Sequence, residues 1–294
     1  MKLHGIFSPI ATPFDYKGDL YRAKLQHNIE KWNQTNLAGY VVCGSTGESV
    51  FLTADEKATL WEWAAEFAAS NKILIAGTGM ESVRETVALT NRAAALGYKA
   101  AMVRTPHYYR NLAAKPDIQA LYFRAVADQV HVPVIIYNWP QATGVDIAAE
   151  TVAELSHHPN IIAIKESSGN MEKVMQIVRE AKEGFQTLVG SAPTLWPSLS
   201  VGAAGAVLAF ANAAPYAAIT IWEAHRSRDV ETARDWQSRI AKAARLVTAV
   251  YGIPGLKYAM DLNGYYGGPP RLPLAPACPR AQQEIAKAFA GIRG

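Results

Sequence analysis

The sequence predicts an α/β chain folded as a (β/α)8 barrel with a C-terminal helical extension. Eight short apolar runs, each bounded by Gly, Pro or Asn, alternate along the chain with stretches of helical length. Most runs are continuously apolar, which is typical of strands buried on both faces of a parallel sheet. The first run is followed by no glycine-rich phosphate fingerprint, which a doubly wound sheet would more often show.

The predicted strands and helices alternate regularly along the chain. The predicted strands are Gly5–Ile10, Tyr40–Cys43, Ile73–Ala76, Ala100–Arg104, Val134–Tyr137, Ile161–Lys165, Thr187–Val189 and Ala206–Ala209. The predicted helices between them include Thr53–Ser70, Ser82–Leu96, Asp117–Val130, Ala148–His157 and Met171–Lys182. Two of these helices open with capping-box spacing, Thr53 before Glu56 and Ser82 before Glu85.

The chain continues well past the eighth predicted strand. Its last part predicts helices at Ala214–Arg226, Asp229–Tyr251, Gly255–Leu262 and Arg280–Ile292, with a proline-rich crossing from Pro269 to Pro279. This is too much chain for one closing helix. We therefore divide the protein into a barrel, residues 1–226, and a C-terminal helical extension, residues 227–294, packed on it.

Composition excludes several classes of protein. With 50% hydrophobic and 18% charged residues, and with 21 Gly and 16 Pro in 294 residues, the chain is neither disordered nor collagenous. A net charge of +4 with scattered basic residues predicts no nucleic-acid partner. No leader or transmembrane pattern is visible, and the two cysteines, Cys43 and Cys278, do not indicate a disulfide-rich secreted scaffold. We expect a cytoplasmic protein without membrane contact.

Two strand ends carry side chains suited to carbonyl chemistry, because catalytic groups of barrels stand at the C-terminal ends of strands. Lys165 closes an apolar run, and poor solvation in a barrel mouth would lower its pKa and make it a nucleophile. Tyr137 ends the preceding strand, about 5 Å away, where its hydroxyl could relay protons to an imine. The structural alternatives are a strand-end lysine paired with Glu166 or a helix terminus, and a core tyrosine.

Loops at the same face add binding candidates. In Gly44–Glu48, two glycines flank hydroxyl residues, so backbone N–H groups could converge on a substrate carboxylate, although a plain tight turn is the alternative. The hydroxyl of Ser45 could join a proton relay. The expected substrate-binding residues are Ser45, Thr46, Gly190 and Val207. Gly190 directly follows the seventh predicted strand, and Val207 lies in the eighth.

These motifs together resemble the dihydrodipicolinate synthase / N-acetylneuraminate lyase family of pyruvate-dependent Schiff-base aldolases, which are (β/α)8 barrels with a C-terminal helical segment. The match runs in the family's order along nearly the whole chain. The matching pieces are Thr12-Pro13-Phe14, Gly44-Ser45-Thr46-Gly47-Glu48, Thr105-Pro106-His107-Tyr108-Tyr109, Tyr137-Asn138-Trp139-Pro140 with Thr143-Gly144, Ile164-Lys165-Glu166-Ser167, and Gly205-Ala206-Val207 with Asn212 and Pro215.

The resemblance implies a catalytic role for several residues. It implies that Lys165 forms the Schiff base, that Tyr137 moves protons, and that Ser45 belongs to the same relay. The N–H groups of Ser45 and Thr46 would hold the carboxylate of pyruvate. Neither a metal nor an organic cofactor is implied, and no cluster of metal ligands is visible in the sequence.

The resemblance also implies a homotetramer built as a dimer of dimers. Tyr108 matches a tyrosine that a neighbouring subunit donates to the site in this family. Tyr109 is the alternative, because this loop varies in length.

One departure from the family pattern bears on the second substrate. Dihydrodipicolinate synthases carry an arginine just before Thr143-Gly144 that binds the aldehyde's carboxylate, and here that place is Ala142. Loss of a guanidinium removes a bidentate carboxylate clamp. Arg104 or Arg110 could supply a replacement charge, although each reads more simply as a surface residue. Together with Ser45, the loop after the fourth strand looks more like the 4-hydroxy-2-oxoglutarate aldolase branch.

We therefore expect a carbon–carbon lyase of the class I aldolase type. Its substrate would be pyruvate or another 2-oxo acid plus an aldehyde, as in cleavage of 4-hydroxy-2-oxoglutarate to pyruvate and glyoxylate. The alternatives are a 4-hydroxy-tetrahydrodipicolinate synthase or a sugar-acid aldolase or dehydratase of the same family, and a non-catalytic protein that binds a 2-oxo acid. A metal-dependent class II aldolase fits less well, because the histidines form no ligand set.

Overall fold

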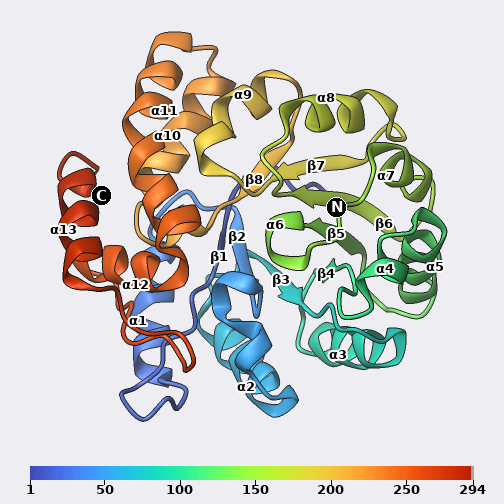
Figure 1. Ribbon diagram of the computed structural model, residues 1–294, viewed down its shortest axis with the longest axis horizontal. Helices are drawn as coiled ribbons and strands as arrows, with labels where there is room; N and C mark the ends of the chain where they lie inside the picture. The colour runs from blue at the N-terminus through green and yellow to red at the C-terminus, as the bar shows by residue number, and fades with distance from the viewer. Residues whose placement is uncertain (293–294) are drawn as a thin grey trace.

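The computed structural model describes residues 1–292 and shows a closed barrel of eight parallel strands surrounded by helices (Figure 1). The strands follow one another around the barrel in chain order. They are β1 Gly5–Pro9, β2 Gly39–Val42, β3 Ile73–Gly77, β4 Ala100–Arg104, β5 Val134–Asn138, β6 Ile161–Glu166, β7 Gln186–Val189 and β8 Gly205–Val207. The predicted fold class is confirmed.

Most helices connect successive strands or close the chain. They are α1 Arg22–Asn33, α2 Ala54–Phe67, α3 Val83–Ala95, α4 Arg110–Ala113, α5 Pro116–Ala127, α6 Pro140–Thr143, α7 Ala149–Leu155, α8 Met171–Glu180, α9 Leu195–Ser200, α10 Pro215–Arg226, α11 Val230–Arg245, α12 Gly252–Leu262 and α13 Pro279–Phe289. Short 3-10 turns are η1 Ser45–Gly47, η2 Ser49–Phe51, η3 Ala192–Thr194 and η4 Ala209–Asn212, and η5 Leu246–Val250 is a π-helical turn.

The strands bury alternate residues on two sides. Met102 and Tyr137 belong to the packed interior of the barrel, whereas Val103 and Ile136 pack outward against the surrounding helices. Both sets are apolar, because neither side of the strand meets water. This double burial explains why the runs in the sequence are continuous, and why the predicted strands match the observed ones within one or two residues.

Local signals set several helix starts. The Thr53 hydroxyl accepts a hydrogen bond from the backbone of Glu56, whose carboxylate accepts one from the Thr53 N–H, so the predicted capping box is present. At α3, Ser82 caps the N–H of Glu85. These caps satisfy backbone donors that a helix leaves open at its first turn.

The short helices α4, α6 and α9 are not among the predicted helices, and α2, α5 and α13 end three residues before the predicted ends. Two larger differences concern α1 and α11. Helix α1, for which the sequence analysis names no range, forms from a largely polar segment that buries Leu25 and Trp32. The helix expected over Asp229–Tyr251 ends at Arg245 and widens into η5, where the Thr248 hydroxyl donates to the carbonyl of Ala244 at 2.7 Å. A π-turn carries an extra residue per turn and commonly occurs beside functional sites.

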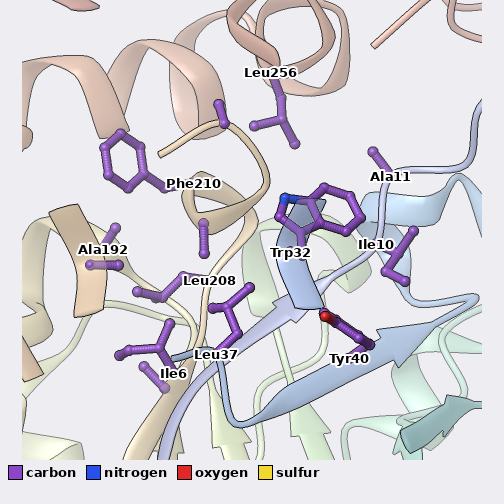
Figure 2. Close-up of a cluster of buried hydrophobic side chains, with 14 of the residues drawn as sticks. Ile6, Ile10, Ala11, Trp32, Leu37, Tyr40, Ala192, Leu208, Phe210 and Leu256 are labelled. Atoms are coloured by element: carbon purple, nitrogen blue, oxygen red, sulfur yellow. The ribbon is translucent and has the colours of Figure 1, made fainter. Parts of the chain in front are cut away.

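The C-terminal helices pack directly on the barrel. Figure 1 shows α11, α12 and α13, in orange and red, on one side of the molecule. Figure 2 shows Trp32 of α1 between Leu256 of α12 and Tyr40 of β2. One continuous apolar cluster thus joins barrel and extension, and the division between residues 226 and 227 stays a prediction, with residues 293 and 294 outside the described part.

A buried ion pair ties the extension to the loop after β2. The Lys257 ammonium of α12 lies 2.7 Å from a carboxylate oxygen of Glu48, and both side chains are almost fully buried. Lys257 also donates to the carbonyls of Thr12 and Pro269, and the backbone N–H of Arg271 donates to the second Glu48 oxygen. The loop after β2 is therefore held in place by the C-terminal part of the chain.

No helix within residues 1–292 has the length and apolar character to cross a bilayer.

We expect Lys257→Met to destabilise the protein by about 3–5 kcal/mol, because it leaves the Glu48 carboxylate buried and unpaired. Equilibrium denaturation measures this loss of unfolding free energy. Lys99→Met, at an exposed lysine, is the matched control and should change stability little. The double variant Glu48→Gln with Lys257→Met should recover part of the loss. Equal stability of Lys257→Met and Lys99→Met would show that the ion pair contributes nothing.

Candidate active site

Lys165 lies in the mouth of the barrel on the side where the strands end. It follows the interior residue Ala163 of β6, whereas Ile164 between them packs outward, so the period of two directs the Lys165 side chain inward. The residue is 5% exposed, and this burial lowers the pKa of its ammonium to about 7. Desolvation disfavours the charged form, so near neutral pH the Lys165 amine is unprotonated in a large fraction of the protein molecules.

Glu166 points to the opposite side of the sheet. Its carboxylate accepts hydrogen bonds from the Asn138 side chain at 2.8 Å and from the Ser168 backbone at 2.6 Å, and it lies 3.7 Å from the Lys173 ammonium. Lys173 also pairs with Asp146. The alternative in which Glu166 neutralises Lys165 is wrong, because consecutive residues of a strand face opposite sides.

Tyr137 is the neighbour that the sequence predicted for Lys165. The two residues are partners in the register of β5 and β6, and the Lys165 nitrogen lies 4.2 Å from the centre of the tyrosine ring. Burial raises the pKa of Tyr137 to about 12, while the adjacent hydroxyls of Ser45 and Ser167 oppose that rise. The phenol therefore stays protonated over the whole physiological range and can donate or pass on a proton.

The loop from Cys43 to Glu48 presents backbone N–H groups at the same mouth. Cys43 and Glu48 both have positive φ, 61° and 57°, a conformation that costs a non-glycine residue of order 1 kcal/mol or more and persists only where surrounding contacts hold it. Between them Ser45 and Thr46 begin the turn η1, where the first N–H groups of a helical turn have no partner within it. The ion pair of Glu48 supplies the restraint.

One cavity collects most of the predicted site. It has a volume of about 500 Å³ and its walls include Lys165, Tyr137, Thr46, Gly190 and Val207. Ser45 stands beside it, lining two adjoining cavities that Tyr137 also borders. The structure thus brings the predicted catalytic and binding residues to one group of adjoining cavities, with Ser45 and Tyr108 outside the cavity of Lys165 itself.

Gly190 makes room for the reacting side chains. A Cβ on this residue would lie 1.8 Å from the Ser167 hydroxyl oxygen and 3.1 Å from Cε of Lys165. The first of these contacts is far shorter than any real Cβ contact. A side chain at position 190 would therefore push Ser167 and Lys165 out of place, which gives the glycine a structural reason to be there.

Tyr108 and Tyr109 are largely exposed, with 79% and 73% of each residue accessible. Their rings meet edge to face at 5.2 Å. Tyr108 borders the adjoining cavity that contains Ser45, but it does not line the cavity of Lys165. Which of the two tyrosines completes a neighbouring site stays a prediction.

Three residues at the site are not among the predicted catalytic or substrate-binding residues, although Arg104 is a possible replacement charge and Ser167 ends a family motif. Ser167 lies beside Tyr137, and Thr248 of η5 lines the large cavity from the C-terminal extension. Arg104, which reads as a surface residue, is mostly buried at the end of β4. Their positions depend on strand register and on the packing of distant segments. Within residues 1–292 no group of three or more His, Cys, Asp or Glu side chains is arranged to hold a metal ion.

Comparison with known proteins gives the family. Residues 2–291 match the model of the dihydrodipicolinate synthetase family. The chain belongs to that family. A relative from Exiguobacterium sp. (strain ATCC BAA-1283 / AT1b), named 4-hydroxy-tetrahydrodipicolinate synthase, is 37% identical over 286 residues, covering 97% of this chain and 96% of the relative. Members of the family are class I aldolases or lyases, and this chain is an enzyme of that class.

Solved structures agree with this assignment. The dihydrodipicolinate synthase of Bacillus anthracis superposes with a TM-score of 0.94 at 26% identity, covering 99% of both chains. A chloride-inhibited dihydrodipicolinate synthase from Acinetobacter baumannii, solved in complex with pyruvate, superposes with a TM-score of 0.93 at 27% identity over 98% of this chain and 99% of that one.

We expect Gly190→Ala to lower kcat by about 10- to 100-fold, because an added methyl group displaces the Lys165 side chain by a fraction of an ångström or more. Steady-state turnover measures the effect, and thermal unfolding checks that the barrel is intact. Gly291→Ala, where an added Cβ meets nothing within 4 Å, is the control. Adding Ser167→Ala should relieve part of the clash. Full activity of Gly190→Ala would contradict this account.

Proposed function

We propose that the protein is a pyruvate-dependent aldolase or lyase that acts through a Schiff base on Lys165. The observation that carries this proposal is a buried lysine that forms no ion pair with any of residues 1–292, has its pKa lowered to about 7, and lies beside a protonated tyrosine. An unprotonated amine is the form that attacks a carbonyl carbon. Lysines kept for structure are mostly exposed or engaged by oxygen acceptors, as Lys72 and Lys257 are.

The reaction begins with addition of the Lys165 amine to the keto carbon of a 2-oxo acid. Tyr137 donates a proton to the oxygen of the resulting carbinolamine, which leaves as water and yields the protonated imine. The imine then withdraws electrons, so that the C3–C4 bond of a 4-hydroxy-2-oxo acid breaks while the 4-hydroxyl loses its proton. The products are an aldehyde and the enamine of pyruvate, and the reverse sequence is aldol addition.

Ser45 and Thr46 are placed to support this sequence. The hydroxyl of Ser45 lies beside Tyr137 and can take part in moving its proton. The N–H groups of Ser45 and Thr46 are suited to hold the carboxylate of the 2-oxo acid, since backbone donors of a turn converge on anions. Gly190 and Val207 form other parts of the same cavity wall.

For the second substrate we propose a small aldehyde that carries a carboxylate, such as glyoxylate, which makes 4-hydroxy-2-oxoglutarate the aldol. Ala142 in place of an arginine and a cavity of about 260 Å³ beside Tyr137 support a small partner. Synthesis of 4-hydroxy-tetrahydrodipicolinate is the second candidate, favoured by the name of the relative that is 37% identical.

We further propose that the chain assembles as a homotetramer in which Tyr108 approaches the site of a neighbouring subunit. Large hydrophobic side chains stand exposed on and just before α4 and on α5, and such side chains are common in contacts between subunits. They are Tyr108, Tyr109, Leu112 and Leu121. A cytoplasmic location stays a prediction.

Incubation with pyruvate followed by borohydride should attach a reduced pyruvyl group to Lys165, which peptide mass spectrometry locates. Buried Lys72 and Lys257 are internal controls in the same digest, because their ammonium groups are engaged by carbonyls or a carboxylate. Lys165→Ala should lose the adduct and all turnover while it still folds. Modification elsewhere, or turnover without Lys165, would refute the proposal.

We also expect kcat/KM for the 2-oxo acid to rise with pH and to level off above about pH 7. Burial lowers the pKa of Lys165 to about 7, so the amine is protonated and inert below that pH and free above it. The slope of the acid limb should be roughly tenfold per pH unit. A pH profile from about 5.5 to about 9.5 measures it. A rate that still rises tenfold per pH unit at the upper end of this range, as the pKa of an exposed lysine, about 10.4, would give, would contradict the burial argument.

A further inference from the structure

Arg104 stands in the same row of residues as Tyr137 and Lys165. In the register of the barrel Arg104 of β4 pairs with Tyr137 of β5, which pairs with Lys165 of β6. Met102 belongs to the barrel interior and Val103 to the outer layer, so the alternation directs Arg104 inward. Only 17% of its side chain is exposed.

The guanidinium is held by one nitrogen. Nη1 donates to Glu81 at 2.9 Å and to the Thr105 carbonyl at 3.3 Å, and lies 2.7 Å from Nδ1 of His107. Across residues 1–292, Nε and Nη2 of Arg104 have no recorded protein acceptor. These two nitrogens form one edge of the fork that binds a carboxylate through two parallel hydrogen bonds.

Glu81 and Gly79 position this arginine. The Glu81 carboxylate also accepts the backbone N–H groups of His107 and Tyr108, so it is shared among several donors and anchors the loop as well as Arg104. Gly79 lets the chain pass close by, because a Cβ there would lie 2.4 Å from the Arg104 backbone nitrogen and 2.9 Å from its Cγ.

Arg104 lines both cavities that adjoin the site of Lys165. The smaller cavity, about 260 Å³, is bordered by Ser45, Tyr137, Ala142 and Thr143. Among the described residues that line it, Arg104 is the only lysine or arginine. The acidic residue of this cavity, Glu48, is already paired with Lys257. In the other cavity, of about 310 Å³, Arg104 is joined by Lys57 and by Glu81. Lys57 is buried and donates to the Met80 sulfur, so positive charge predominates.

We propose that Arg104 binds the carboxylate of the second substrate and makes the enzyme select aldehydes that carry a negative charge. Arg104 and Tyr137 line the same two cavities, and Tyr137 also lines the cavity of Lys165. An aldehyde whose carboxylate is held by the free edge of the guanidinium would therefore lie beside Tyr137, next to the enamine on Lys165. This inference rests on the proposed aldolase function and adds a specificity-determining residue to it.

Arg110 does not fill this role. It is exposed at the start of α4, and its guanidinium packs over the turn at Gly144, where an added Cβ would lie 2.7 Å from Cζ of Arg110. It lines neither of the two adjoining cavities. Arg110 is therefore a matched control of the same residue type.

The test compares wild type, Arg104→Gln, Arg104→Lys and Arg110→Gln with pyruvate and two sets of aldehydes. Glyoxylate and succinic semialdehyde carry a carboxylate, whereas glycolaldehyde and propanal are neutral.

We expect wild type to prefer the charged set. In Arg104→Gln, kcat/KM for the charged set should fall about 10- to 100-fold, the range for loss of hydrogen bonds to a charged group, mainly through KM. The neutral set should change less than about threefold. Arg104→Lys should lie between, and Arg110→Gln should behave as wild type.

Borohydride trapping of pyruvate distinguishes a failure of the proposed aldolase function from a failure of the proposed role of Arg104. Trapping on Lys165 should be unchanged in all four proteins, which also shows that each variant has folded. Absence of trapping in the wild type would overturn the proposed function itself. Normal trapping with an equal loss for both sets of aldehydes in Arg104→Gln, or a wild type without preference for the charged set, would overturn the role of Arg104. A selective loss in Arg110→Gln would overturn it as well.

Discussion

The site depends on one ammonium group that is buried without a counter-charge. Other buried lysines have polar partners: Lys72 donates to two carbonyls, Lys173 pairs with Asp146, and Lys257 pairs with Glu48. Lys57 is also buried and donates to the Met80 sulfur, but it does not line the cavity of Lys165. Burial alone lowers the pKa of Lys165, and no ion pair opposes the shift. The fold therefore gives up stability at this position, and in return presents an amine that is reactive near neutral pH.

Closure of the barrel puts the partners of this amine in place. In the closed barrel of eight parallel strands, the end of each strand lies beside the end of the next. One row across β4, β5 and β6 therefore contains Arg104, Tyr137 and Lys165, although they lie far apart in the sequence. The row orders three functions across the mouth: a fork for an anion, a phenol for proton transfer and an amine for the carbonyl carbon. A one-residue slip between β4 and β5, or between β5 and β6, would turn a member of this row outward.

The C-terminal helices contribute more than a cover for the barrel. Through Lys257 and Arg271 they hold Glu48, and with it the loop that presents Ser45 and Thr46. Through η5 they form part of the wall of the main cavity. The turns of the barrel and the far end of the chain are in this way parts of one site, which is consistent with the apolar cluster that spans both.

The sequence by itself determined the fold class, most strand positions and the identity of Lys165, Tyr137 and Ser45 as candidates. These follow from local properties: continuous apolar runs, cap residues, and polar groups placed at the ends of runs. Only the tertiary structure decided where side chains point. Closure and register turned Glu166 away from Lys165 and turned Arg104 inward, and the packing of α12 on η4 and on Trp32 of α1 placed η5 at the cavity. Such outcomes depend on which distant segments meet, and this information lies in no single stretch of the chain.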